Sequence, residues 1–250
     1  MATLPSLGGK VALITGAARR IGAAISRCLH ADGANIVVHY RSSASDAKTL
    51  CDELNAIRPD SAMSVQADLT ATAQLPDLIA TTTAWHGTLD ILINNASSFY
   101  PTPIGEISED NWNDVIGANL KAPLFLSQAA VDALRQARGV IINIVDIHSQ
   151  RPLRDHAVYG SSKAGLAMLT RSLAKDLAPD IRVNGVSPGA ILWPEAGLSD
   201  ATKTTVLEQI PAGRIGNTSD VAGCVLYLVR DATYVTGQII AVDGGRSIGW

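Results

Sequence analysis

The chain has 250 residues, of which 47% are apolar and only 17% are charged, and this balance excludes a disordered or linker-type protein. A formal net charge of −3 and the lack of any basic run longer than Arg19-Arg20 argue against nucleic acid and membranes as partners. With 4 Trp, 5 Tyr and 2 Phe, no repeated aromatic platform for sugars or single-stranded RNA is expected.

Cysteine usage and hydropathy predict a cytoplasmic protein. The three cysteines are far apart and odd in number, which suggests neither a disulfide framework nor a thiolate zinc site. No uncharged apolar stretch approaches the ~18 residues that a membrane span needs, and residues 1–10 lack the basic head and apolar run of a signal peptide. The five histidines show no paired spacing typical of metal ligands, so no metal is expected.

Apolar segments of strand length alternate with segments of helical length along the chain. The predicted strands are residues 10–15, 35–40, 62–66, 90–94, 140–145, 181–186 and 238–242. The predicted helices are residues 21–31, 45–57, 71–85, 111–137, 157–177 and 219–229. Such alternation predicts parallel strands joined by crossover helices. Because no linker interrupts it, we expect one doubly wound α/β domain over residues 1–250, with a flexible substrate loop at about 189–216.

The loop after the first predicted strand, residues 15–22, is a candidate phosphate site. In doubly wound sheets, ligands bind beyond the carboxyl ends of the strands. This loop joins a strand to a helix, where free N–H groups and the helix dipole can hold a pyrophosphate. The loop is not G-x-G-x-x-G, and its place after the first strand is what favours a nucleotide over an ordinary tight turn.

The end of the second predicted strand indicates NADPH as the cofactor. An NAD site would have a carboxylate there for the ribose 2′-hydroxyl, whereas an NADP site needs a cation for the 2′-phosphate. The segment reads Tyr40-Arg41-Ser42, and the first acid is Asp46. Arg41 can bond phosphate oxygens in a bidentate manner and Ser42 can donate a hydrogen bond. A solvated surface arginine is the alternative interpretation of Arg41.

Tyr159 and Lys163 form a candidate catalytic pair. Four residues apart near a predicted helix start, they share one face, so the ammonium can lower the phenol pKa from ~10 and enable proton transfer near neutral pH. A Y-x-x-x-K pair taken alone is typical of a helix surface. Its place after a strand of this sheet, together with Asn94-Asn95-Ala96 after the fourth strand, favours the catalytic interpretation.

Together these motifs resemble the short-chain dehydrogenase/reductase family over essentially the whole chain. The matching residues are 15–22, Asn94-Asn95-Ala96, Asn119, Tyr159 to Lys163, and Pro188-Gly189. The resemblance implies a Rossmann-type seven-stranded sheet and Tyr159 as the catalytic acid/base. It also implies that Lys163 binds the nicotinamide ribose, that Asn119 completes a proton relay through water, and that the protein is a homotetramer built on two long helices.

Two departures from the general family pattern are similar to the pteridine reductases. Arg20 stands where T-G-x-x-x-G-x-G has its middle glycine, and Asp146 stands where a serine precedes the tyrosine by thirteen residues. The run 94–103, Asn-Asn-Ala-Ser-Ser-Phe-Tyr-Pro-Thr-Pro, shares this similarity. One difference is that the extra histidine of those reductases before Arg41 is lacking, so the 2′-phosphate contacts can be distributed differently.

The carboxylate of Asp146 independently favours reduction of a C=N bond. Negative charge builds on the oxygen of a ketone as hydride arrives, and a carboxylate would oppose it. A C=N nitrogen must instead gain a proton, which Asp146 can stabilise or relay through Tyr159. Phe99 can stack on a flat heterocycle, with a core ring beneath a loop as the alternative, and Arg20 can bond a cofactor phosphate and a ring oxygen together.

The sequence therefore predicts an NADPH-dependent pteridine reductase acting on dihydropterins, with oxidised pterins and dihydrofolate as further candidate substrates. The alternatives are a carbonyl reductase of the 3-oxoacyl thioester class and a non-catalytic NADPH-binding sensor. The predicted catalytic residues are Asp146, Tyr159, Lys163 and Asn119, and the predicted substrate contacts are Arg20, Ser97, Phe99, Asp146 and Tyr159. The predicted cofactor contacts are Gly16, Arg20, Ile21, Tyr40, Arg41, Ser42, Asp68, Leu69, Asn95, Ala96, Ser97, Tyr159, Lys163, Pro188 and Gly189.

Overall fold

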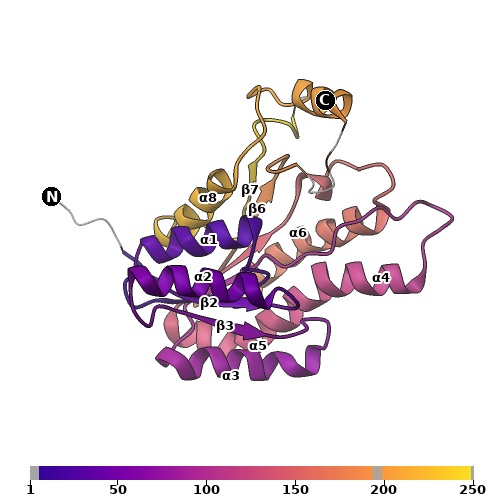
Figure 1. Cartoon of the computed structure of the whole chain (residues 1–250). Helices are drawn as coiled ribbons and strands as arrows, with labels where there is room; N and C mark the ends of the chain where they lie inside the picture. Colours follow the sequence, from indigo (N-terminus) through magenta and orange to yellow (C-terminus); the bar gives the residue numbers. More distant parts are fainter. Residues whose placement is uncertain (1–5, 194–196, 198, 249–250) are drawn as a thin grey trace.

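The computed structural model describes residues 6–193, 197 and 199–248 (Figure 1). Among these residues, seven strands form one parallel sheet in the order β3-β2-β1-β4-β5-β6-β7. The strands are β1 (Val11–Ile14), β2 (Asn35–Tyr40), β3 (Ala62–Gln66), β4 (Ile91–Asn94), β5 (Val140–Ile144), β6 (Arg182–Pro188) and β7 (Ile239–Val242). The predicted Rossmann-type sheet and its single domain are confirmed, with strand bounds within two residues of those expected.

Helices cover both faces of the sheet. They are α1 (Arg20–Ala31), α2 (Ala44–Ile57), α3 (Leu75–His86), α4 (Glu109–Ile116), α5 (Ala122–Ala137), α6 (Ala157–Leu177), α7 (Asp200–Glu208) and α8 (Thr218–Arg230), with short turns η1 (Thr72–Gln74), η2 (Gly117–Lys121) and η3 (Ile147–Ser149). In Figure 1, α1 and α8 lie above the sheet and α3 and α5 below it. None of the helices within the described residues is long and apolar enough to cross a membrane.

The buried strand β1 shows why the strands read as continuous apolar runs. Ala12 and Ile14 join the core beneath α1, α2 and α8, whereas Val11 and Leu13 join the core against α3, α5 and α6. A strand covered on both faces needs apolar residues at every position, not at alternate ones. The strand order reverses between β1 and β4, so a crevice opens at their carboxyl ends, where ligands of such sheets bind.

The predicted helix 111–137 is helical throughout, but it contains a π-helical turn that the sequence did not predict. It is divided into α4 and α5 by the π-helical turn η2, in which the Ala122 amide bonds back to the Gly117 carbonyl. Pro123 follows in the first turn of α5, where a missing N–H is tolerated. An extra residue in one turn leaves the apolar period almost unchanged, so the sequence pattern does not reveal it.

The segment 189–216, predicted to be irregular, contains α7. Ser199 caps this helix by accepting a hydrogen bond from the Thr202 amide over 3.2 Å. None of its nine residues is buried, so it lacks the apolar period that would have marked it. Residues 194–196 and 198 of the predicted substrate loop lie outside the described residues, and the loop's flexibility stays a prediction.

Candidate active site

The loop after β1, residues 15–22 (the glycine loop), is tied to the segment after β4. The Thr15 hydroxyl donates to the Ile93 carbonyl over 3.2 Å and accepts from the amides of Asn95 and Ala96. The Asn95 side chain donates in turn to the carbonyls of Thr15 and Gly16. Gly16 has a φ of +58°, and a Cβ there would lie 3.0 Å from the Ala96 Cα. Only glycine fits this close approach.

A pocket of about 400 Å³ opens where the loops after β1, β2, β3 and β4 meet. Most predicted cofactor contacts line it, namely Gly16, Arg20, Ile21, Tyr40, Arg41, Ser42, Asp68, Leu69, Asn95, Ala96 and Ser97. Arg19, from the predicted phosphate loop, lines it as well, as do His39 in β2 and Ser43 shortly after this strand. The other predicted contacts, Tyr159, Lys163, Pro188 and Gly189, are not among the residues that line it.

The charges around this pocket suit a phosphorylated dinucleotide. Arg19, Arg20 and Arg41 line it, and Arg19 Nη2 donates to Ser43 Oγ over 3.0 Å. Asp68 is the one carboxylate among the described lining residues, and hydrogen bonds from the Thr70 hydroxyl and amide lower its pKa. The N-terminus of α1 faces the pocket, so its free amides add donors for a pyrophosphate. These residues fit NADP(H).

Arg20 adopts a backbone conformation that favours glycine. Its φ is +53°, and an L-residue with a Cβ holds this left-handed conformation at a cost of about 1 kcal/mol. The family pattern has glycine here, so the chain keeps the backbone shape while adding a guanidinium. A strained residue that lines a pocket is typical of a functional site, which supports the predicted role of Arg20.

His39 is a pocket residue that sequence reasoning missed. Its side chain is 2% exposed, Nδ1 accepts the Gly16 N–H over 3.2 Å, and Nε2 lies 3.1 Å from the Ala67 carbonyl oxygen. Because a carbonyl can only accept, Nε2 carries the proton and the imidazole is neutral. Burial lowers the pKa of His39 to about 4, against the opposing effects of Ala67 and Asp68. His39 therefore fastens the glycine loop to the end of β3.

Acidification should destabilise the wild-type protein more than a His39→Asn variant, which keeps an acceptor but does not titrate. The folded-state pKa of about 4 lies below the ordinary 6.5, so the unfolded chain takes up the proton first as pH falls. The stabilisation is complete above pH 6.5 and is lost progressively between 6.5 and 4. Between pH 7 and 4.5 the extra loss in free energy of unfolding should be about 2.5 kcal/mol.

Urea unfolding at both pH values, followed by circular dichroism, measures this difference between the two proteins. Equal pH dependence in wild type and His39→Asn would contradict the neutral, buried imidazole.

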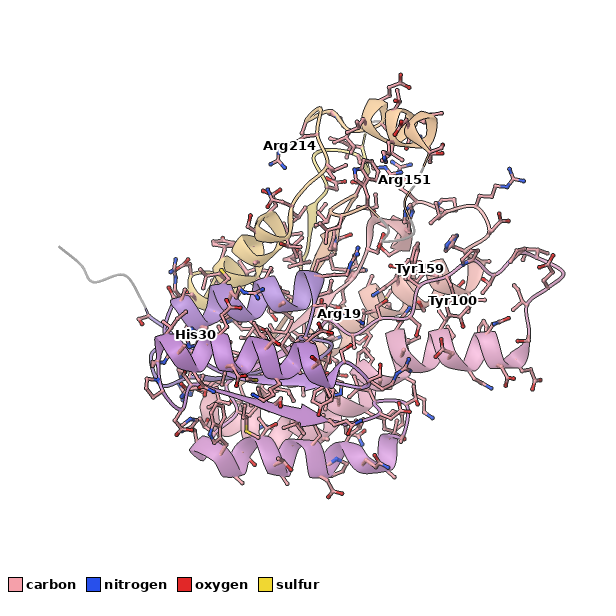
Figure 2. The ribbon with its side chains drawn as sticks, in the orientation of Figure 1. Arg19, His30, Tyr100, Arg151, Tyr159 and Arg214 are labelled. Carbon is pink, nitrogen blue, oxygen red and sulfur yellow. The ribbon has the colours of Figure 1, made fainter. Side chains whose placement is uncertain are left out.

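The predicted catalytic residues Asp146, Tyr159 and Lys163 meet at the carboxyl end of β5. The Tyr159 hydroxyl donates to Asp146 Oδ2 over 2.8 Å, and Asp146 Oδ1 accepts the His148 amide. Lys163 Nζ donates to the Ile144 carbonyl over 3.0 Å and lies 5.7 Å from the centroid of the Tyr159 ring. Tyr159 and Lys163 belong to α6, and Asp146 lies just after β5, where it caps the turn η3. Figure 2 shows Tyr159 well away from His30, which lies toward the opposite end of the molecule.

The expectation that Lys163 lowers the phenol pKa is wrong for the free protein. Burial, together with the negative charge and hydrogen bond of Asp146, raises the pKa of Tyr159 well above its ordinary value. Burial also lowers the pKa of Lys163 to about 8, although Asp146 opposes that shift. Burial is the largest cause of the Tyr159 shift, and Asp146 adds to it because its carboxylate accepts a hydrogen bond directly from the phenol. The phenol therefore holds its proton and is set up as a proton donor.

Asn119 lies in η2 and binds the loop that follows β4. Its Oδ1 accepts the Ser98 amide over 2.8 Å, and its Nδ2 donates to the Ser98 carbonyl and to Ser162 Oγ. Ser162 donates to the Tyr159 carbonyl over 2.7 Å. The side chain thus links the loop to the helix that carries Tyr159, and the π-helical turn places it there. Its part in a water relay stays a prediction.

Phe99 projects from the same loop beside Tyr159. It is 53% exposed, which rules out the core-ring alternative, and its centroid lies 4.7 Å from that of Tyr159 with the ring planes at 75°. The next residue, Tyr100, packs against the small core cluster that contains Tyr159 and donates to Asp114 Oδ2 in α4 over 3.1 Å. Tyr100 therefore anchors the loop while Phe99 remains available to a ligand.

The segment after β7 lies near Asp146, and no motif had indicated it. Arg151 Nε donates to the Ser247 carbonyl over 2.9 Å, and Arg246 Nη2 donates to Gln209 Oε1 over 3.1 Å. Burial lowers the pKa of Arg246, and the carboxylates of Asp146 and Asp243 oppose this shift.

Within the described part of the chain, no group of three His, Cys, Asp or Glu side chains is placed to hold a metal ion.

Comparison with known proteins adds the family context. A family model described as enoyl-(acyl carrier protein) reductase matches residues 16–247. The chain is 37% identical to pteridine reductase 1 of Leishmania tarentolae over 99% of both chains. It is also 37% identical to the 3-oxoacyl-[acyl-carrier-protein] reductase of Staphylococcus aureus, over 94% of this chain and 97% of that protein. An uncharacterized oxidoreductase of Methylorubrum extorquens is 36% identical over 97% of this chain and 99% of its own. Because the pteridine reductase and the 3-oxoacyl reductase are equally similar to this chain, overall identity does not indicate the substrate, which has to be inferred from the residues of the site.

Proposed function

This chain belongs to the short-chain dehydrogenase/reductase family of NAD(P)-dependent oxidoreductases, and from that premise we propose that it is an NADPH-dependent pteridine reductase. The observation that carries the proposal is the carboxylate of Asp146, which lies 2.8 Å from the Tyr159 hydroxyl where the family pattern has a serine. A carboxylate there opposes charge on a ketone oxygen but favours a nitrogen that gains a proton. The exposed Phe99 ring adds a surface suited to a flat heterocycle.

The cofactor pocket favours NADPH over NADH. Arg41 and Ser42 line the pocket at the end of β2, and both groups suit a 2′-phosphate. Arg20 and the N-terminal amides of α1 suit the pyrophosphate. NADPH, when bound there, supplies the hydride that reduces the carbon of a C=N bond.

Tyr159 supplies the proton in this proposal. Its phenol keeps the proton at neutral pH because burial and Asp146 raise its pKa. The hydroxyl donates its proton to the substrate nitrogen ahead of hydride arrival at the carbon, and Asp146 stabilises the positive charge that the nitrogen carries until the hydride neutralises it. Lys163 is held against the Ile144 carbonyl, where its ammonium can offset the charge left on the phenol oxygen.

The test is turnover of dihydrobiopterin by the purified protein with NADPH, followed by the loss of nicotinamide absorbance. We expect tetrahydrobiopterin formation well above the rate of a Tyr159→Phe variant. A 3-oxoacyl thioester assayed in parallel should react far more slowly. Reduction of the thioester alone would refute the proposal and support the carbonyl reductase alternative. Tight NADPH binding with no reaction on either substrate would support the sensor alternative.

An Arg41→Leu variant should lose its preference for NADPH. A charge-assisted hydrogen bond to phosphate contributes about 1.5–3 kcal/mol, so the KM for NADPH should rise roughly 10- to 100-fold. The KM for NADH is the internal control, because NADH lacks the 2′-phosphate and should change less than about twofold. Steady-state kinetics with both cofactors measures the ratio. An equal rise for both cofactors would show that Arg41 does not bind the 2′-phosphate.

We expect the protein to assemble as a homotetramer through the faces of α4, α5 and α6. Trp112, Phe125 and Met168 are large apolar side chains of these helices that remain exposed, at 50%, 37% and 60%. Covering such side chains with a partner protein is favourable, and the family resemblance implies that this partner is another copy of the same chain. Analytical ultracentrifugation should show tetramers that a Phe125→Glu variant dissociates. A monomeric wild type would contradict this expectation.

A further inference from the structure

Phe99, His156 and Tyr159 form a cluster of three rings beside the Asp146 carboxylate. The Phe99 and His156 ring centroids are 4.8 Å apart with their planes at 21°, which is a stacked arrangement. The His156 and Tyr159 centroids are 6.4 Å apart with their planes at 82°. Phe99 therefore contacts both other rings, and His156 reaches Tyr159 only at its edge.

Backbone contacts fix His156 in this cluster. Its Nδ1 lies 2.7 Å from the Arg154 carbonyl oxygen, and because a carbonyl only accepts, Nδ1 carries the proton in that bond. The His156 carbonyl accepts the Gly160 amide over 2.8 Å in the first turn of α6. His156 also pairs with Thr102 in a parallel bridge, in which the Thr102 amide donates to the Asp155 carbonyl. The loop that carries Phe99 is thus joined to the start of α6.

The cluster leaves one face of the Phe99 ring open. Seen from the Phe99 centroid, the directions to His156 and Tyr159 are nearly at a right angle, given the three centroid separations. His156 therefore stacks on one face of the ring, and Tyr159 does not lie opposite it across the ring. The face opposite His156 is thus not stacked on Tyr159, and Phe99 remains 53% exposed.

We propose that His156 is a positioning residue for substrate binding, whose imidazole holds the Phe99 ring so that the open face receives a planar heteroaromatic substrate. The inference rests on the proposed function. An exposed phenyl ring on a loop would otherwise have to be ordered when the substrate binds, and ordering it in the free protein improves affinity. Aromatic pairs prefer such offset stacking, so a ring at position 156 is what the arrangement requires.

The test compares ring and non-ring side chains at position 156 in the full-length protein. His156→Ala and His156→Gln should each raise the KM for dihydrobiopterin roughly 5- to 10-fold, the range that loss of an aromatic stack produces. Their kcat at saturating substrate should change less than about twofold, and the KM for NADPH should not change. His156→Phe should restore the wild-type KM, because a phenyl ring can stack on Phe99. Circular dichroism and NADPH binding confirm folding of each variant.

Two results would overturn the inference. If His156→Phe raises the KM as much as His156→Gln does, the hydrogen bond and not the ring is what matters. If none of the three variants changes the KM, His156 does not position the substrate. Dissociation constants of dihydrobiopterin from the NADP⁺ complex, measured by fluorescence titration, separate this inference from the proposed function. If the wild-type protein binds dihydrobiopterin but does not reduce it, the proposed function is refuted. The inference about His156 is then tested by whether His156→Ala and His156→Gln raise the dissociation constant for dihydrobiopterin and His156→Phe does not.

Discussion

Replacing Tyr159 by phenylalanine should lower kcat for dihydropterin reduction about 1,000-fold, the typical contribution of a positioned general acid. The phenol is the group that the structure presents as a proton donor, since it is buried, protonated and 2.8 Å from Asp146 Oδ2. NADPH binding should be retained, because Tyr159 does not line the cofactor pocket. Single-turnover kinetics with saturating NADPH measures the chemical step directly.

Tyr100→Phe is the matched control for this substitution. Tyr100 lies in the loop after β4, and its hydroxyl also donates to a carboxylate, Asp114 Oδ2 in α4, over 3.1 Å. Each variant therefore loses one hydroxyl hydrogen bond to a carboxylate, an interaction that contributes about 1.5–3 kcal/mol to stability. Tyr100→Phe should lower kcat less than tenfold. Equal losses of kcat in the two variants would indicate a general loosening of the site and not the loss of a proton donor.

The fold was predictable because its main signals are local. Apolar strand-length runs such as 35–40 and 140–145 are continuous, since β2 and β5 are buried on both faces. Sequence order then places the loops after β1 and β4 at the reversal of strand order, which brings the predicted Gly16 and Asn95 together. The helix α7 was not predictable, because none of its residues is buried and it therefore has no apolar period. The turn η2 was not predictable, because it leaves the apolar period of the surrounding helical segment almost unchanged.

The contacts that the sequence did not predict join residues that are distant along the chain. His39 bonds to Gly16, and His156 stacks on Phe99, but no spacing in the sequence connects either pair. The direction of the Tyr159 pKa shift was also wrong, because the i, i+4 spacing to Lys163 is visible in the sequence whereas the direct bond to Asp146 is not. The motifs were enough to identify the catalytic residues, but the direction of a pKa shift depends on burial and on neighbouring charges, which only the three-dimensional arrangement shows.

An Asp146→Ser variant should reverse the substrate preference. With serine in place of the carboxylate, the charge that opposes a developing ketone oxyanion is removed and a hydroxyl donor is added. Dihydropterin reduction should fall about 100-fold, and reduction of a 3-oxoacyl thioester should rise from near background. The pKa of Tyr159 should decrease toward its ordinary value, because the charge of Asp146 is one cause of its elevation, although burial would remain. The pH profile of kcat/KM reports that decrease as an earlier fall in activity on the alkaline side.

Asp146→Asn removes the charge of Asp146 while keeping the shape of its side chain. The single oxygen of asparagine can still accept the His148 amide, so the local turn η3 should persist, whereas its Nδ2 replaces Oδ2 and can donate to the Tyr159 oxygen instead of accepting from it. If charge is what suits the site to a C=N bond, Asp146→Asn should lose most of the dihydropterin activity while its melting temperature stays close to that of the wild type. Full activity of Asp146→Asn on dihydropterin, or loss of thioester reduction in Asp146→Ser with pterin reduction preserved, would contradict the electrostatic basis of the proposed specificity.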